Sequence, residues 1–361
     1  MTRVSSRRSD YLEWTKRRRD TIRYSLARSG APRLDLRRLE PTLDFLLTID
    51  ANEDGWPPLL EKIAARAELT PAHVVLANAC TGANHVAFGL LLDPGDHVAM
   101  EAPVYEPLVK LADYFGAGID HFARSESNGW RIDPDDVKRA LTPRTKLVVL
   151  SNLHNPTGCH DGDDTIRRIA AHAHQVGAYV LVDEVYLEFL HAEGVRTAAR
   201  LAPNILISNS MTKTYGLDTL RMGWVLAEPA LAERGRRLSD LYTNNMAHPS
   251  ERLATLALAR ADAILSGVNA LLAQHIAIVD DFVRTHARLS WVRPRAGTCG
   301  MVRLEGDNVD ELTDRLARDH ATGIVPGRFF NAPSHFRLAW GVDTETLRTG
   351  LGHLSTALDH R

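Results

Sequence analysis

Between residues 74 and 227, short apolar runs alternate with stretches of helical periodicity. Several of these runs are rich in Val, Ile and Leu without polar alternation, which is typical of strands that are covered on both faces. This alternation predicts an α/β domain with a mostly parallel sheet between helices. The expected strands are Val74–Ala77, His97–Met100, Lys146–Leu150, Tyr179–Val182, Ile205–Ser208 and Met222–Ala227, and the expected helices are Thr81–Leu92, Val104–Phe115, Asp163–Val176 and Ala198–Leu201.

A long helical region follows Pro229 and runs to about Arg288. The remainder mixes short strands with helices, so it predicts a small α+β domain. The expected strands there are Met301–Leu304 and Phe336–Trp340, and the expected helices are Val309–Arg318 and Thr344–Leu358. We therefore predict an N-terminal arm and part of a small domain at 1–40, a large domain at 41–235, and a connecting helix with the small C-terminal domain at 236–361.

Composition narrows the class of protein. The 361 residues are 44% hydrophobic and 24% charged, which is ordinary for a globular protein. A net charge of −2 gives no electrostatic argument for nucleic acid or an anionic membrane, and the apolar runs are short for a membrane span. Three widely separated cysteines (Cys80, Cys159 and Cys299) favour reduced thiols over a disulfide framework. We expect a cytoplasmic protein without nucleic-acid or membrane partners.

The N-terminal segment is rich in arginine. Its Ser-Arg-Arg run is not followed by the apolar stretch that an export signal requires. A basic helix over Tyr11–Arg23 could bind nucleic acid or a membrane surface. The interpretation that we favour is an arm or helix that packs through Tyr11, Leu12, Trp14 and Ile22.

Polar residues gather where the expected strands end, and ligands of parallel α/β sheets bind beyond the carboxyl ends of strands. Gly82 lies where a helix opens, and the free amides there suit a phosphate, although a plain strand–turn–helix junction has the same pattern. Tyr105 could stack on a planar ring or simply pack. Asn155, in a dense polar turn, offers a ligand both a donor and an acceptor, unless it bonds its own backbone.

Two charged residues in apolar runs need partners. Asp183 ends an apolar strand, where a carboxylate is costly unless it is paired. A protonated pyridine nitrogen would satisfy it, and so would the start of a following helix. Tyr186, three residues later, could place its side chain near the phenolic oxygen of the same ring. Arg337 suits either a substrate carboxylate, which it would bind with two parallel hydrogen bonds, or an internal salt bridge.

Lys213 carries the most direct chemistry. It follows an apolar run, and burial lowers the pKa of a lysine because desolvation disfavours the ammonium. A neutral amine is a nucleophile that forms a Schiff base with an aldehyde. The nearby Ser210, Thr212 and Arg221 suit an anion such as a phosphate. An aldehyde and a phosphate on one small molecule indicate pyridoxal 5′-phosphate (PLP). The alternative is a surface lysine followed by an arginine in a salt bridge.

In their order along the chain, these segments resemble the class I/II aminotransferases, which are fold type I PLP-dependent enzymes. The resemblance runs over nearly the whole chain and implies a large PLP-binding domain with a seven-stranded type of sheet. It also implies a homodimer with active sites at the subunit interface. The matching motifs are SGAP (Ser29–Pro32), TGAN (Thr81–Asn84), PVY (Pro103–Tyr105), NPTG (Asn155–Gly158), DEVY (Asp183–Tyr186), SMTK (Ser210–Lys213), Arg221 and FRLAW (Phe336–Trp340).

The resemblance implies a role for each matched residue. Lys213 would hold PLP as a Schiff base and move the proton between the substrate Cα and the cofactor. Asp183 would pair with the pyridinium nitrogen, and Tyr105 would stack on the ring. Tyr186 and Asn155 would hydrogen-bond the 3′ oxygen of the ring. The substrate carboxylate would bind Arg337, Asn155 and the backbone at Gly30. The phosphate would be held by Gly82, Ala83, Asn84, Ser210 and Arg221.

One segment departs from the family pattern. Many relatives have a tyrosine shortly before the glycine that Gly55 matches, and it reaches the phosphate in the neighbouring subunit. No tyrosine occurs from residue 33 to residue 56 in this chain, so the contact is either lost or supplied by Asn52 or another polar group. The segment around Asp50–Gly55 is also acidic. If it lines the pocket, it favours a substrate with a distal amine or guanidine.

The resemblance favours an aminotransferase of amino acid metabolism or biosynthesis that moves an amino group from an L-amino acid to a 2-oxo acid. The same motifs serve a β-eliminating C–S lyase, a decarboxylase, a racemase or a cyclase of a modified amino acid, because they report the cofactor and not the bond that breaks. A PLP-binding transcription regulator needs a winged helix domain, for which the segment before Ser29 is too short. His172 and His174 lie on different helix faces, so we expect no metal site.

Overall fold

The computed structural model describes residues 8–359. Its large sheet has seven strands in the order β2-β8-β7-β6-β5-β3-β4. Strand β8 runs antiparallel to both of its neighbours, and the other strands share one direction. The predicted mostly parallel α/β architecture is therefore confirmed. The strands are β2 (Val74–Asn78), β3 (His97–Ala102), β4 (Gly118–Ala123), β5 (Thr145–Ser151), β6 (Tyr179–Asp183), β7 (Ile205–Ser210) and β8 (Met222–Leu226).

Strand β4 and one short helix differ from the sequence prediction. β4 lies at the edge of the sheet beside β3, and Phe122 is its buried residue. An edge strand that stays largely exposed needs no continuous apolar run, so the apolar pattern did not indicate it. The helix expected at Ala198–Leu201 is only a 3-10 turn, η5 (Ala198–Arg200), because so few residues cannot sustain an α-helix on their own.

Helices cover both faces of the large sheet. Successive residues of a strand point to opposite faces. In β5, Val148 and Leu150 join one core with α3, α6, α7 and α9, whereas Leu147 and Val149 join another with α4, α5 and α8. Both faces need apolar residues, which explains the continuous apolar runs. The helices are α2 (Leu43–Leu47), α3 (Pro57–Ala67), α4 (Ala79–Leu91), α5 (Glu106–Phe115), α6 (Pro134–Ala140), α7 (Asp163–Gln175), α8 (Pro229–Ser239) and α9 (His248–Ala259).

The last part of the chain forms a second, smaller sheet of four strands in the order β12-β13-β10-β9. Its strands are antiparallel, and helices α10, α11 and α12 bury a separate core against it that contains Val302, Leu316, Phe336 and Leu354. The bounds are α10 (Ala261–Thr285), β9 (Leu289–Trp291), β10 (Cys299–Leu304), α11 (Val309–His320), β11 (Thr322–Gly323), β12 (Val325–Pro326), β13 (His335–Ala339) and α12 (Thr344–Asp359).

Helix α10 corrects one expectation from the sequence. Within residues 8–359 it is long and apolar enough to cross a membrane, judged by length and composition alone. A core helix passes the same test, and His275 in α10 is fully buried, with its ring nitrogens 2.9 Å from the Trp340 carbonyl oxygen and 2.9 Å from Thr344 Oγ1. The prediction that the apolar runs are short for a membrane span is thus wrong for this helix.

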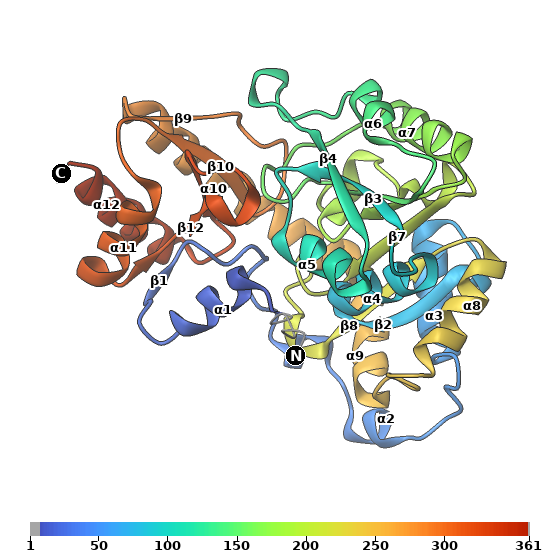
Figure 1. Ribbon diagram of the computed structural model, residues 1–361. Helices are drawn as coiled ribbons and strands as arrows, with labels where there is room; N and C mark the ends of the chain where they lie inside the picture. Colours follow the sequence, from blue (N-terminus) through green and yellow to red (C-terminus); the bar gives the residue numbers. More distant parts are fainter. Residues whose placement is uncertain (1–7, 360–361) are drawn as a thin grey trace, which may run out of the picture.

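The N-terminal segment joins the two parts of the molecule. Figure 1 shows α1 (Asp10–Arg17) between them, and β1 (Tyr24–Ser25) pairs in parallel with β11. The Glu106 carboxylate accepts from Tyr11 N at 2.8 Å, which places a negative charge at the positive end of α1. The arm packs through Tyr11, Leu12 and Trp14 against a small cluster around Phe329 and Phe330. The domain boundaries at 40/41 and 235/236 stay a prediction.

The contact between Gly341 and Gly30 gives a test of how the N-terminal segment is held. A Cβ at position 341 would lie 2.0 Å from Gly30 O, far inside any real contact. Gly341→Ala must therefore displace this segment, and we expect it to lower stability by about 1–3 kcal/mol.

The matched control is Gly352→Ala in α12, where an added Cβ meets nothing within 4 Å and alanine is the better helix former. Differential scanning calorimetry should show a lower melting temperature for the first variant and an unchanged or higher one for the second. Equal melting temperatures would contradict the tight contact.

Candidate active site

A cavity of about 540 Å³ lies where the parallel strands end. Ser151 ends β5, Asp183 ends β6 and Ser210 ends β7, and all of them line it. The N-terminal segment and α11 close the opposite side, so the cavity lies between the two parts of the molecule. Of the residues predicted from the sequence, Gly30, Gly82, Ala83 and Arg337 do not line it, whereas the others do: Asn84, Tyr105, Asn155, Asp183, Tyr186, Ser210, Lys213 and Arg221.

Lys213 follows β7 and lies on the cavity wall. Its Nζ lies 3.5 Å from Ser29 Oγ, and its carbonyl oxygen accepts from Ala31 N at 2.7 Å. Burial, aided by the positive charge of Arg337, lowers the pKa of Lys213 to about 8. Part of the side chain still opens to the cavity. The residue therefore offers a substantial fraction of neutral amine near physiological pH.

Asp183 is a buried carboxylate that forms no ion pair with a described side chain. Its Oδ2 accepts from Asn84 Nδ2 at 3.2 Å and lies 3.4 Å from Cys80 Sγ, and its Oδ1 accepts from Val185 N at 3.1 Å. Burial raises the pKa of Asp183, although the hydrogen bonds from Asn84 and Val185 oppose this. Within residues 8–359 no lysine, arginine or histidine forms an ion pair with it. The carboxylate is thus available to a cation in the cavity.

The candidate phosphate site differs in detail from the prediction. Helix α4 begins at Ala79, so the amides of Gly82 and Ala83 already lie beyond the free first turn. Cys80 and Thr81, which line the cavity, carry the remaining amides of the first turn, since Ala79 N donates to Arg221 O at 2.9 Å. Asn84 turns its side chain to Asp183 and not to an anion site. The predicted amide donors therefore shift toward the helix start, whereas Ser210 and Arg221 line the cavity as expected.

Arg337 is fully buried, at 0% exposure, behind the cavity wall. Its NH1 donates to Asn155 Oδ1 at 3.0 Å, and its NH2 donates to Tyr11 Oη at 2.7 Å and to Ala27 O at 3.1 Å. No carboxylate of the described chain pairs with it. The alternative of an internal salt bridge is therefore wrong, and the guanidinium lacks a counter-charge.

The two tyrosines and Gly30 take up specific positions. Tyr186 Oη donates to Ser29 O at 2.6 Å, so its hydroxyl is directed to the N-terminal segment. Tyr105 lies at the start of α5, and its ring meets that of Tyr11 edge-on, with centroids 5.8 Å apart. Gly30 lies against Lys213, because a Cβ there would be 3.5 Å from Lys213 Cδ.

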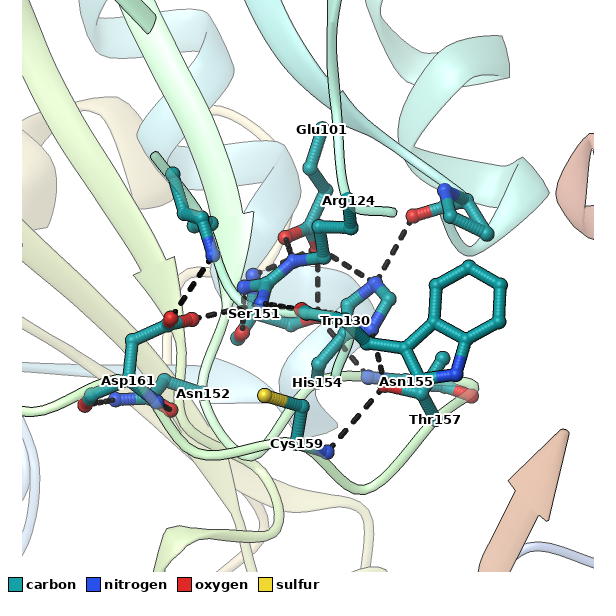
Figure 2. Close-up of polar contacts among 12 residues, drawn as sticks. Glu101, Arg124, Trp130, Ser151, Asn152, His154, Asn155, Thr157, Cys159 and Asp161 are labelled. Atoms are coloured by element: carbon teal, nitrogen blue, oxygen red, sulfur yellow. Dashed lines mark hydrogen bonds and ion pairs between the residues drawn. The ribbon is translucent and has the colours of Figure 1, made fainter. Parts of the chain in front are cut away.

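A buried ion network behind the cavity was not predicted from the sequence. Figure 2 shows Arg124 between two carboxylates: its Nε donates to Glu101 Oε2 and its NH1 donates to Asp161 Oδ2, both at 2.7 Å. All of these side chains are almost fully inaccessible. Arg124 directly follows β4, and the sequence pattern did not reveal that edge strand. The sequence therefore did not predict that the Arg124 guanidinium is buried between carboxylates.

This network supports the turn that carries Asn155. Glu101 Oε1 accepts from Ser151 Oγ at 2.7 Å, and Ser151 Oγ accepts from Asn155 N at 3.1 Å (Figure 2). The ring nitrogens of His154 lie 2.6 Å from Thr157 Oγ1 and 2.9 Å from Pro103 O. Burial, followed by the charge of Arg124, lowers the pKa of His154 well below its usual value, so the ring is neutral. The turn is thus held by buried side chains, of which Glu101 and His154 do not line the cavity.

The acidic segment at 50–55 does not line the cavity of its own chain. Asp50 accepts from Arg252 NH2 at 2.8 Å, and Asp54 pairs with Arg237. The acidic segment was expected to favour a substrate with a distal amine or guanidine only if it lined the pocket, and within one chain it does not. Arginines of the N-terminal segment line the cavity instead, among them Arg18, Arg19 and Arg28.

Known proteins share this fold and these motifs. The family model for aminotransferase class I and II matches residues 51–354. Capreomycidine synthase of Streptomyces vinaceus is 28% identical in an alignment that covers 96% of this chain and 92% of that protein. An aspartate aminotransferase of Streptomyces avermitilis is 25% identical over 84% of this chain and 80% of its own length.

Solved structures agree. A PLP-dependent aminotransferase from Streptococcus suis superposes with a TM-score of 0.91 at 26% identity, covering 98% of this chain and 97% of that one. The PLP-dependent cyclase OrfR superposes with a TM-score of 0.86 at 24% identity over 98% and 97% of the two chains, which shows the shared fold alone. The family model covers most of the sequence, and the chain belongs to the class I and II aminotransferase family of PLP-dependent enzymes.

Proposed function

We propose that this protein is an aminotransferase that moves an amino group from an L-amino acid to a 2-oxo acid, and that it works as a homodimer. The observation that carries the proposal is the position of Lys213 in the cavity with a pKa lowered to about 8. It is the only lysine in the described cavity lining, where no histidine is present.

The residues of the cavity fit PLP at three points. Asp183, buried without an ion pair to a described side chain, suits a protonated pyridine nitrogen. The start of α4 at Cys80 and Thr81, together with Ser210 and Arg221, suits the phosphate. Lys213 supplies the amine for the aldehyde. When bound, PLP supplies an electron sink that stabilises negative charge at the substrate Cα.

Lys213 can serve as the base at both ends of a transamination. Lys213 would take the proton from the substrate Cα and later give it back, so one neutral amine of suitable pKa would be sufficient. Other ionisable groups in the lining are less suited, because burial raises the pKa values of Cys80, Tyr105 and Tyr186. Asp183 would keep the proton on the ring nitrogen, and the buried charge of Arg337 would favour an α-carboxylate nearby.

A cyclisation of a modified amino acid is the second candidate. The match to capreomycidine synthase covers 96% of this chain, whereas the match to the aspartate aminotransferase covers 84%. The same lysine and aspartate would serve both reactions, because they act on the proton at Cα and on the cofactor. The two candidates therefore differ in the fate of the amino group.

The first test measures where the amino group of the substrate ends up. PLP-loaded protein should be incubated with single L-amino acids in the absence of a 2-oxo acid. Transamination predicts one equivalent of pyridoxamine phosphate per site and the matching 2-oxo acid, measured by chromatography. A product that keeps its nitrogen while the cofactor stays PLP would favour cyclisation, and pyruvate with ammonia would favour β-elimination.

Replacement of the lysine is the second test. Lys213→Ala removes both the covalent partner of the cofactor and the base, so we expect turnover to fall by about 10³-fold or more. Lys138→Ala, on the exposed face of α6, is the matched control and should leave turnover unchanged. Amino-group transfer by the Lys213→Ala variant at the normal rate would refute the assignment.

The pKa of Lys213 predicts how cofactor loading depends on pH. The lowered value means that the amine is charged below about pH 8 and neutral above it. Only the neutral amine attacks an aldehyde, so the rate of PLP loading by the apoprotein should rise with pH, with a midpoint of about 8, in stopped-flow absorbance.

Arg337→Gln sharpens this test because it removes a positive charge that lowers the pKa of Lys213. The midpoint should therefore move to higher pH in this variant. A midpoint that stays in place, or falls, would contradict the electrostatic coupling between the two residues.

A further inference from the structure

We propose that Asn84 and Cys80 of α4 are positioning residues for Asp183, whose carboxylate they hold as an anion ready to pair with the ring nitrogen of PLP. The family motif indicated Asn84 as a phosphate contact, but its side chain turns to Asp183 instead. All three residues line the cavity. Transamination and cyclisation use the same cofactor, so this role does not depend on which of them the protein performs.

Both side chains donate to the same oxygen of the carboxylate. Asn84 Nδ2 donates to Asp183 Oδ2 at 3.2 Å, and Cys80 Sγ donates to it at 3.4 Å. A further contact of 3.8 Å, from Asn84 Nδ2 to Cys80 Sγ, links the two donors. The other oxygen, Oδ1, accepts from Val185 N at 3.1 Å. The exposed fractions are 9% for Cys80, 5% for Asn84 and 6% for Asp183, so little water competes for these hydrogen bonds.

The protonation states of these groups favour an ionised Asp183. Burial, followed by the charge of Asp183, raises the pKa of Cys80 well above its usual value, so the thiol keeps the proton that it donates. Hydrogen bonds to the charged form of a carboxylate favour that form. Burial raises the pKa of Asp183, and the hydrogen bond from Asn84 is the largest effect that opposes this, ahead of those from Val185 and Cys80. The charge of Lys213 contributes less.

The cofactor requires the anionic form of Asp183. A protonated carboxyl group cannot balance the charge of a pyridinium, and a buried pyridinium without a counter-charge is costly. A protonated ring nitrogen also makes PLP the stronger electron sink. Asn84 and Cys80 therefore act on the cofactor through Asp183.

Helix α4 explains why a residue of the TGAN motif serves the ring nitrogen. Cys80 and Asn84 are four residues apart, so their side chains lie on the same face of the helix. The amides of Cys80 and Thr81, in the first turn, suit the phosphate. Asn84 lies one turn further along, where it meets the end of β6 at Asp183. One helix would thus set the spacing between the phosphate site and the carboxylate for the ring nitrogen.

Pyridoxal separates this role from a phosphate contact, because it has the ring and the aldehyde of PLP but lacks the phosphate. If Asn84 bound the phosphate, Asn84→Ala would weaken PLP and leave pyridoxal unchanged. If Asn84 acts through Asp183, the variant weakens both ligands by the same factor. Dissociation constants of the apoprotein for both ligands are measured from the change in their absorbance. Arg221→Gln is the reference for a phosphate contact and should weaken PLP alone.

We expect Asn84→Ala to weaken PLP and pyridoxal about 10-fold each, as for the loss of a hydrogen bond to a charged group. Cys80→Ala should weaken both ligands by a smaller factor, because a thiol is the weaker donor. Cys80→Ser keeps a donor at this position and should bind both ligands more tightly than Cys80→Ala does. Asn128→Ala, at an exposed position outside the cavity lining, is the matched control and should change neither constant.

A double-mutant cycle tests for a merely structural role. Asp183→Asn removes the charge that Asn84 serves, so Asn84→Ala should have little further effect on either ligand in that background. Weakening of PLP alone by Asn84→Ala would overturn the inference, and so would unchanged binding of both ligands. Equal weakening that persists in the Asp183→Asn background would overturn it too. If Asn84→Ala does not fold, the two cysteine variants decide, and equal binding by Cys80→Ala and Cys80→Ser would contradict the proposal.

Discussion

Burial of charge at the carboxyl edge of the large sheet is the constraint on which the site depends. A buried ion is costly unless an opposite charge and hydrogen bonds compensate it. Glu101, Arg124 and Asp161 satisfy one another behind the cavity. Asp183 and Arg337 have hydrogen bonds but form no ion pair with a described side chain, although the charge of Lys213 acts on Asp183. The cavity between them therefore suits a ligand that brings a cation to one end and an anion to the other.

The sequence predicted the residues that make up this edge because they sit in short polar segments directly after apolar strands. Lys213, Asp183 and Asn155 were found in this way, and all of them line the cavity. Features that depend on tertiary geometry were not predicted. The first-turn amides shift to Cys80 and Thr81 because α4 starts at Ala79, three residues before the glycine that indicated the helix.

Arg124 and Tyr11 show why the rest of the site escaped prediction. Arg124 follows an edge strand without an apolar run, and its partners lie 23 and 37 residues away in the chain. Tyr11 was expected to pack, and it does, but its hydroxyl lies 2.7 Å from an arginine that is 326 residues away. Pairings across such separations leave no local pattern in a single sequence.

The family motifs describe how PLP is held, whereas the N-terminal segment contributes much of the remaining cavity wall. The central claim is that Lys213 holds the cofactor. Borohydride reduction of the PLP-loaded protein, followed by peptide mass spectrometry, tests it most directly. We expect a phosphopyridoxyl group on the peptide that contains Lys213. The same group on a different lysine, or no covalent attachment after reduction, would contradict it.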